Sequence, residues 1–120
     1  MLLPDFYTLQ HREVIANQIN ARILLHAEHP IFKGHFPNNP VTPGVCMLQV
    51  FKELAEEVVQ RPLKIQSCKN IKFTALINPF VHPELAIEIT LTPNGETYKI
   101  SGSASFADTQ ALKIQALLTD

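Results

Sequence analysis

One segment of the chain, residues 43–60, has a helical pattern that is apolar around much of its circumference. Its apolar positions recur three and four residues apart, as on an α-helix. They are Val45, Leu48, Phe51, Leu54, Ala55, Val58 and Val59. Thr42 is a suitable capping residue, Pro43 suits the first helical position, and Pro62 ends the pattern. A single helix of this kind needs other elements to cover it, which predicts a sheet wrapped around it.

Most of the remaining chain alternates apolar and polar residues with the period of two that is typical of β-strands. The clearest case is residues 85–92, LAIEITLT, followed by Pro93-Asn94-Gly95, since Asn-Gly accepts the positive φ angles of a tight hairpin. Further strands, the second of them bulged, are predicted at residues 14–28, 65–77, 97–106 and 111–118. Residues 14–28 also place isoleucines four apart, so a helix remains an alternative there. The predicted fold is α+β: strand, loop, long helix and about four antiparallel strands.

Composition narrows the class of protein. Of the 120 residues, 46% are hydrophobic and 18% charged, so we expect one domain, residues 1–120, with a packed core. The net charge of −1 and the lack of a basic block argue against nucleic acid as a partner. No apolar run approaches the roughly 20 residues of a spanning helix, and the start lacks a signal-peptide pattern, so we expect no membrane partner and a cytoplasmic protein. Cys46 and Cys68 lack the spacing of a disulfide framework or zinc site, which predicts two reduced, buried thiols.

Directly before the predicted helix lies a loop that is rich in proline and glycine. Three prolines restrict its backbone, whereas Gly34 and Gly44 permit unusual angles or close approach. His35 stands in this loop beside a helix start, where free N–H groups give a partial positive charge. This arrangement indicates an acid/base site for a carbonyl substrate. The alternative is a structural histidine in a rigid connection.

The segment GHFPNNPVTPGVCMLQ, residues 34–49, resembles the signature of the 3-hydroxyacyl-[acyl-carrier-protein] dehydratases, a family with the hotdog fold. The family pattern reads G-H-F-P-G-x-P-V-M-P-G-V-L-x-x-E, or ends in Asp. The positions that match in register are Gly34, His35, Phe36, Pro37, Pro40, Val41, Pro43, Gly44 and Val45. The resemblance implies a hotdog domain in which an antiparallel sheet wraps one long helix, over the chain from about residue 10.

The resemblance also implies a chemistry. In that family a histidine abstracts the α-proton of a thioester, a helix carboxylate protonates the leaving hydroxyl, and a glycine N–H at the helix start holds the carbonyl. The two catalytic side chains come from opposite subunits of a dimer. Carried onto this chain, His35 is the base, the Gly44 amide is the carbonyl donor, and Gln49 stands in the acid position.

The implied substrate is a 3-hydroxyacyl thioester on the phosphopantetheine of acyl-carrier protein, or on coenzyme A, in fatty-acid or related lipid or polyene biosynthesis. Phe73 and Phe80, with Phe36 of the loop, are candidates to line a tunnel for that arm, although aromatic core residues are the alternative. Basic residues that an acidic carrier protein would contact are Arg12, Arg22, Lys33, Lys69 and Lys72. We expect no cofactor and no metal, because the spacing of the histidines fits no strong ligand motif.

Gln49 departs from the family pattern, since an amide has no titratable proton to deliver. Losing a positioned general acid typically costs about 10²–10⁴-fold in rate. Four interpretations remain open: a dehydratase that works with His35 and water, a subunit that pairs with a complete dehydratase, a degenerate acyl-binding subunit, or an acyl thioesterase. Gln49 could also begin a solvent-facing polar stripe on the helix, in which Glu53 would be either a solvated charge or a substitute acid.

Overall fold

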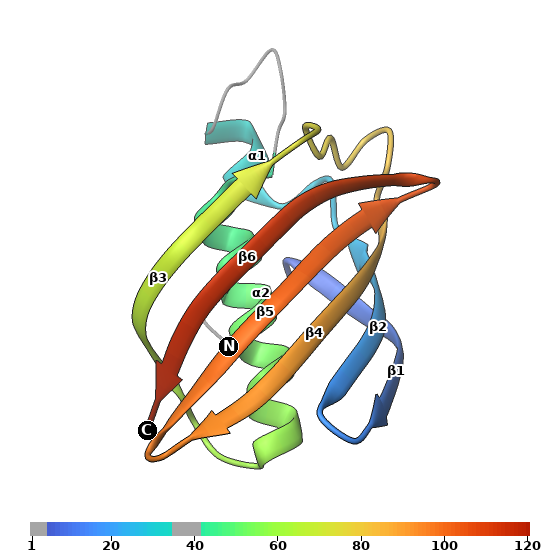
Figure 1. Cartoon of the computed structure of the whole chain (residues 1–120). Helices are drawn as coiled ribbons and strands as arrows, with labels where there is room; N and C mark the ends of the chain where they lie inside the picture. The colour runs from blue at the N-terminus through green and yellow to red at the C-terminus, as the bar shows by residue number, and fades with distance from the viewer. Residues whose placement is uncertain (1–4, 35–41) are drawn as a thin grey trace.

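The computed structural model describes residues 5–34 and 42–120, together with their side chains except at positions 33 and 34. Within these residues, an antiparallel sheet curves around a long helix, α2 (Gly44–Val59), as Figure 1 shows. The strands are β1 (Tyr7–Ile15), β2 (Gln18–Leu25), β3 (Lys64–Phe73), β4 (Glu84–Asn94), β5 (Thr97–Phe106) and β6 (Thr109–Thr119). Their order is β1-β2-β4-β5-β6-β3, so β1 and β3 form the edges. The predicted α+β fold, a hotdog with one wrapped helix, is confirmed.

The N-terminal part differs from the prediction of one strand over residues 14–28. The chain turns at Ala16, whose φ is 53°, and forms the β1–β2 hairpin instead. A short helix, α1 (Pro30–Gly34), occupies part of the segment predicted to be a loop. Phe32 of α1 is buried and stacks on Phe6, with the ring centroids 5.6 Å apart. This contact anchors α1 to the hydrophobic core.

The C-terminal half follows the prediction closely. β5 has the predicted bounds, and the predicted turn joins β4 to β5, with Gly95 at a φ of 64°. The register of β3 against β6 shifts twice, between Ile65 and Ser67 and between Cys68 and Asn70, so the predicted bulge is present. These strands were predictable because their alternation reflects one face packed on α2 and one face turned away.

The sheet and α2 pack tightly against each other at Gly102 of β5. A Cβ atom there would lie 2.5 Å from the backbone oxygen of Glu88 and 2.7 Å from the ring of Phe51. Phe51 is fully buried under this strand. The glycine therefore lets the helix lie deep against the sheet, and this contact positions the turn of α2 that carries Gln49 and Glu53.

The cap of α2 differs from the prediction. Thr42 was expected to cap the helix, but Pro43 is at the N-cap position and no side-chain capping bond is present. Thr42 is buried, and its Oγ1 donates to the Ile77 carbonyl at 3.0 Å. The residue therefore joins the start of α2 to the connection between β3 and β4.

The edge strand β3 is exposed along almost its whole length. Cys68 on this strand is exposed, so the prediction of two buried thiols is wrong for Cys68 and correct for Cys46. Cys68 lies on an edge strand that is exposed at every residue except Ile71. In the described part of the chain, no helix has the length and apolar character needed to cross a bilayer.

Candidate functional site

The described structure reaches both ends of the predicted site loop. His35, Phe36, Pro37, Pro40 and Val41 lie outside the described residues, so their predicted roles stay predictions. Gly34 is the last residue of α1. On the far side, the backbone N–H of Thr42 donates to the Ile77 carbonyl at 2.8 Å, in addition to the side-chain bond. The two described ends of the loop are thus held by core contacts.

Gly44, the predicted carbonyl donor, is the first residue of α2. A Cβ atom at this position would lie 3.3 Å from the Phe73 ring and 3.4 Å from Ile71, so glycine allows β3 to approach the helix start. The first N–H groups of a helix have no partner within it. Among the described residues, no acceptor is bonded to the amides of Gly44 and Val45. Within residues 5–34 and 42–120, the helix start therefore has two N–H groups without a bonded acceptor, beside the end of β3.

Exposed apolar side chains gather at the same end of the molecule. They come from the start of α2, the end of β3 and the connection to β4, and they are Val45, Phe73, Leu76, Phe80 and Val81. The two tunnel candidates, Phe73 and Phe80, are 37% and 61% exposed. An apolar surface of this kind is typical of a binding or pairing face.

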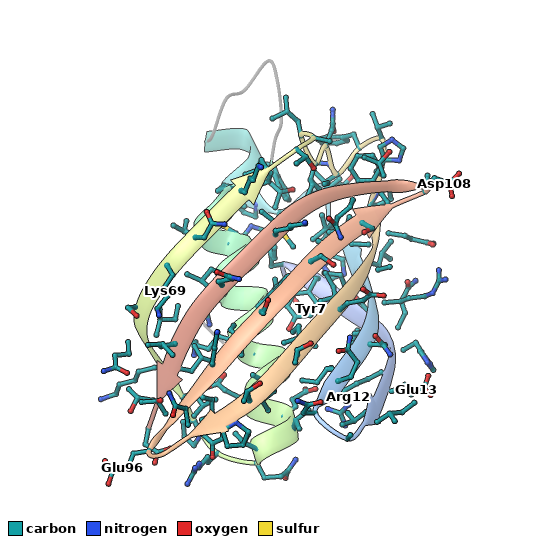
Figure 2. All side chains as sticks on the ribbon, in the orientation of Figure 1. Tyr7, Arg12, Glu13, Lys69, Glu96 and Asp108 are labelled. Atoms are coloured by element: carbon teal, nitrogen blue, oxygen red, sulfur yellow. The ribbon has the colours of Figure 1, made fainter. Side chains whose placement is uncertain are left out.

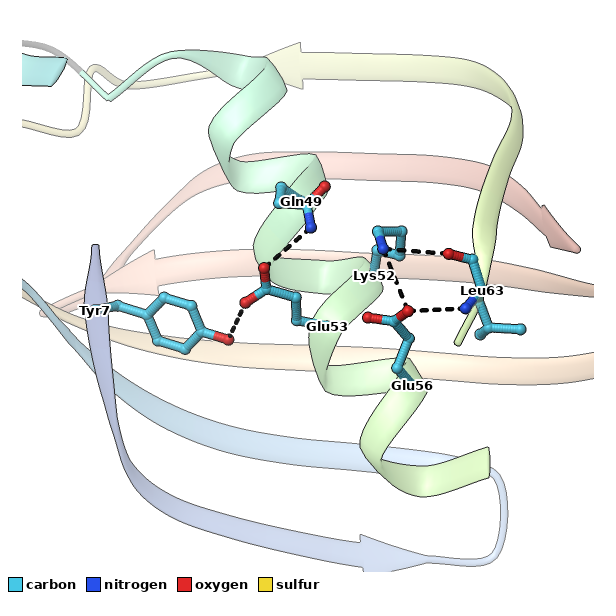
Figure 3. A network of polar contacts seen from close by, with 6 residues as sticks. All are labelled: Tyr7, Gln49, Lys52, Glu53, Glu56 and Leu63. Atoms are coloured by element: carbon cyan, nitrogen blue, oxygen red, sulfur yellow. Dashed lines mark hydrogen bonds and ion pairs between the residues drawn. The ribbon is translucent and has the colours of Figure 1, made fainter. Parts of the chain in front are cut away.

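Gln49 does not face solvent. It is only 8% exposed, as is Glu53, so the interpretation of a solvated stripe is wrong at these two positions. The Gln49 amide donates from Nε2 to Glu53 Oε2 at 3.0 Å, and the Tyr7 hydroxyl donates to Glu53 Oε1 at 2.9 Å (Figure 3). The three side chains form a network, here called the Glu53 network, between α2 and the edge strand β1.

Glu53 is a nearly buried carboxylate whose two oxygens each accept a hydrogen bond from a neutral group. No ion pair to Glu53 is found in the part of the chain that the structure describes. Burial, followed by the neighbouring Glu53 charge, raises the pKa of Tyr7 above its ordinary value, so the phenol keeps its proton at neutral pH. A buried charge without a cation is costly to maintain, and such sites are candidates for function.

A second network lies on the same helix. Glu56 Oε2 accepts from Lys52 Nζ at 3.3 Å and from the Leu63 backbone N–H at 2.8 Å, while Lys52 Nζ donates to the Leu63 carbonyl at 3.2 Å (Figure 3). This Glu56 network joins α2 to the residue just before β3. Its charges are paired, and its contacts are to backbone.

Sequence reasoning placed Gln49 and considered Glu53, but it did not find Tyr7. The tyrosine is 46 residues from Glu53 in the chain, on β1, where no strand was predicted before residue 14. No local signal in the sequence points to the pair, because the contact depends on how β1 crosses α2.

The histidines provide no metal site in the described ranges, where no group of three potential ligands lies together. His26 bonds through Nδ1 to the Asp5 carbonyl at 2.7 Å and through Nε2 to Thr8 Oγ1 at 2.6 Å. These contacts hold the β1–β2 hairpin, which is a structural use of the ring.

Comparisons with known proteins agree on the family. The model of a family described as ApeI-like, ApeI dehydratase, matches residues 11–112. The 3-hydroxyacyl-[acyl-carrier-protein] dehydratase FabZ of Caulobacter sp. is 25% identical over 95 residues, which cover 72% of this chain and 58% of that protein. FabZ of Rickettsia akari is 30% identical over 91 residues, 65% of this chain and 63% of that protein. The chain therefore matches only about three fifths of the length of these relatives.

Solved structures share the fold. The dehydratase heterocomplex ApeI:P from Xenorhabdus doucetiae aligns with a TM-score of 0.75 and 21% identity, covering 94% of this chain and 97% of that one. A mutant thioesterase from Pseudomonas aeruginosa aligns with a TM-score of 0.68 and 9% identity, covering 98% of this chain and 81% of that one. At these identities the likeness concerns the hotdog fold alone.

Proposed function

The chain belongs to the ApeI-like dehydratase family, and on that premise we propose that it is a dehydratase subunit acting on 3-hydroxyacyl thioesters of acyl-carrier protein or coenzyme A. In this proposal His35 removes the α-proton, and the Gly44 amide holds the thioester carbonyl while negative charge develops on its oxygen. The hydroxyl on the β-carbon then leaves as water once an acid has protonated it.

The observation that carries the proposal is the bonding of Gln49. Its amide has no acidic proton, and the nearby Glu53 has both oxygens engaged by donors, so neither side chain is built to protonate a leaving hydroxyl. A complete site then needs an acid from another chain. In a dimer whose sites draw on both subunits, His35 of this chain would work with the helix carboxylate of a different, complete subunit.

The edge strand β3 supports pairing with a different chain. It carries Lys64, Lys69 and Lys72 and no acidic residue, and its apolar Ile65 and Phe73 remain partly exposed. Figure 2 shows Lys69 at the outer margin of β3, across the sheet from Arg12 and Glu13 of β1. Two copies meeting along β3 would bring two rows of lysines together, which is unfavourable. A partner with a neutral or acidic edge avoids this repulsion.

The similarity to a dehydratase heterocomplex is consistent with such a partnership. The exposed Phe73 and Phe80 also fit the proposal, because a partner placed over the apolar surface would complete a tunnel for the pantetheine arm. Without a partner to cover this apolar surface, the pantetheine arm bound there would be exposed to water.

The second candidate function is an acyl thioesterase. One observation favours it: the Gln49 amide is held in place, and a fixed amide is able to orient a water molecule against a thioester carbonyl. This activity would release a free thiol and would not form an enoyl product.

The test mixes this chain with a family dehydratase that retains its helix carboxylate but has its own base histidine replaced by alanine. The mixture is supplied with a 3-hydroxyacyl pantetheine thioester, and enoyl product and free thiol are both followed. In this mixture the single complete site combines His35 with the partner's carboxylate. We expect enoyl product that disappears with His35→Ala, whereas each chain alone gives far less.

Free thiol in place of enoyl product would establish the thioesterase instead. Equal enoyl formation by the chain alone would overturn the need for a partner. Neither product in any mixture, with the two chains shown to associate, would leave a degenerate acyl-binding subunit and contradict the proposal.

A further inference from the structure

The Gln49 amide has two possible orientations, and its surroundings choose between them. An ionised carboxylate only accepts hydrogen bonds, so the group of Gln49 that faces Glu53 must be the N–H₂ group. The carbonyl oxygen, Oε1, is then turned away from Glu53 (Figure 3). No donor to Oε1 is found among the described residues. As far as the described residues show, Oε1 is an acceptor without a donor, while the Nε2 donor is engaged.

Tyr7 secures this orientation from the other side of Glu53. Its hydroxyl donates to Oε1 of the carboxylate at 2.9 Å, so the carboxylate itself is held in one position. A donor on each oxygen occupies both sides of the carboxylate and fixes its plane. The two residues thereby act on Gln49 without themselves serving as an acid.

The arrangement is poorly explained as a stabilising feature. Glu53 is 8% exposed and lacks an ion-pair partner in the described ranges, and a well-packed apolar residue would avoid the desolvation cost of such a charge. A fixed acceptor in the register of the family's acid position has a use at a substrate hydroxyl. There the family's carboxylate donates a proton, whereas an amide oxygen is only able to receive a hydrogen bond.

We propose that Glu53 and Tyr7 are positioning residues that hold the Gln49 amide with Oε1 toward the substrate, where it accepts a hydrogen bond from the 3-hydroxyl group. The site containing Gln49 thus selects 3-hydroxyacyl chains over saturated chains of the same length. This inference rests on the proposed function, because that function supplies the 3-hydroxyl group that Gln49 would contact.

The first arm of the test examines the orientation without any ligand. The side-chain N–H₂ signals of Gln49 are assigned by nuclear magnetic resonance from their loss in Gln49→Met. We expect one N–H proton that exchanges slowly with water in the native chain. In Glu53→Leu, where no acceptor remains, that protection is lost, whereas the matched control Glu56→Gln leaves it unchanged. Unprotected Gln49 protons in the native chain would overturn the inference.

The second arm measures binding by calorimetry on the protein in its native oligomeric state. The probes are a 3-hydroxyacyl amide of pantetheine, with nitrogen in place of the thioester sulfur, and the saturated acyl amide of equal length. A single hydrogen bond to the hydroxyl predicts a preference of about three- to tenfold for the first probe. We expect Glu53→Gln to reduce this preference, because the new amide permits Gln49 to turn over, and Tyr7→Phe to reduce it less.

The outcomes separate the two proposals. Binding of both probes with equal affinity would overturn the hydroxyl selection and leave the proposed function intact. A preference that survives Glu53→Gln unchanged would remove the positioning role. If neither probe binds to any oligomer of the chain, the proposed function fails, and the hydroxyl selection fails with it.

Discussion

The two polar networks of α2 begin three residues apart, yet they differ in almost every respect. Glu56 is paired with Lys52 and bonded to the backbone at Leu63, so its charge is balanced and its contacts join two consecutive elements. Glu53 is more deeply buried, has only neutral donors, and reaches Tyr7 on a strand far away in the sequence. A balanced network tied to backbone is typical of a structural link. An unbalanced one is typical of a functional site.

This comparison shows that hydrogen bonding alone does not identify function. Both carboxylates are satisfied, and both lie on the same helix. They differ in two ways: the Glu56 charge is paired with Lys52, and each carboxylate orients a different kind of group. The Glu56 network orients backbone, whereas the Glu53 network orients another side chain, Gln49.

The largest effect on stability is expected from Gln49→Glu, which places a second carboxylate against Glu53. Two like charges placed in direct contact repel each other, which costs on the order of several kcal/mol. The cost is greatest when both groups are ionised and falls as the pH drops and the pair takes up a proton. Urea unfolding at several pH values measures it.

The control for this variant is the exchange Gln49→Glu/Glu53→Gln, which keeps one charge and one amide in the same space. Its stability should return to within about 1 kcal/mol of the native chain. Equal destabilisation of the single and double variants would show that charge repulsion is not the cause.

Glu56→Ala is expected to cost about 1–3 kcal/mol, because it leaves the Leu63 N–H and Lys52 without their acceptor. Denaturant unfolding measures the loss, and activity per folded molecule should be unchanged. If Glu56→Ala lost activity but kept its full stability, the Glu56 network would also be functional, and the difference between the two networks would not hold.

Tyr7→Phe removes one hydrogen bond and is expected to cost about 1 kcal/mol near neutral pH. Because the folded pKa of Tyr7 is raised, its contribution is fully present below the ordinary tyrosine pKa of about 10 and is lost as the pH rises through the folded value. The native chain should therefore lose more stability at alkaline pH than Tyr7→Phe. Parallel unfolding curves for the two proteins across that range would contradict the buried tyrosine–carboxylate contact.

Arg12→Ala should have the smallest effect. Arg12 bonds to Glu57 at 2.6 Å on the same flank as Tyr7, but both side chains are well exposed. Exposed ion pairs typically contribute about 0–1 kcal/mol, and salt screens them. Unfolding at low and high salt checks this, and a loss as large as that of Tyr7→Phe would show that the exposed pair belongs to the Glu53 network.

The fold was largely predictable because its main signals are local. The alternation of β4 to β6 and the helical period of α2 each record one buried face over consecutive residues. The β1–β2 turn was missed because Ala16, which adopts a positive φ there, is not a typical turn residue. The predicted strand over residues 14–28 therefore joined the last two residues of β1 to β2, and the rest of β1 was not predicted.

Only the part of the candidate site that lies within one continuous segment of the chain was predictable. The resemblance over residues 34–49 placed Gln49 at the acid position, and the helical pattern alone suggested that it faced water. The structure instead buries Gln49 and bonds it to Glu53, whose other oxygen accepts from Tyr7 on the distant strand β1. The contact between Tyr7 and Glu53, 46 residues apart, leaves no periodic trace in the sequence.

The lysines along β3 have a consequence for the time between synthesis and assembly. An open strand edge is a template for the addition of further strands, and repeated addition leads to fibrils. Lys64, Lys69 and Lys72 make that template repel its own copies. These charges protect a newly made chain from repeated self-addition, and under the proposed pairing the same charges would also select the partner.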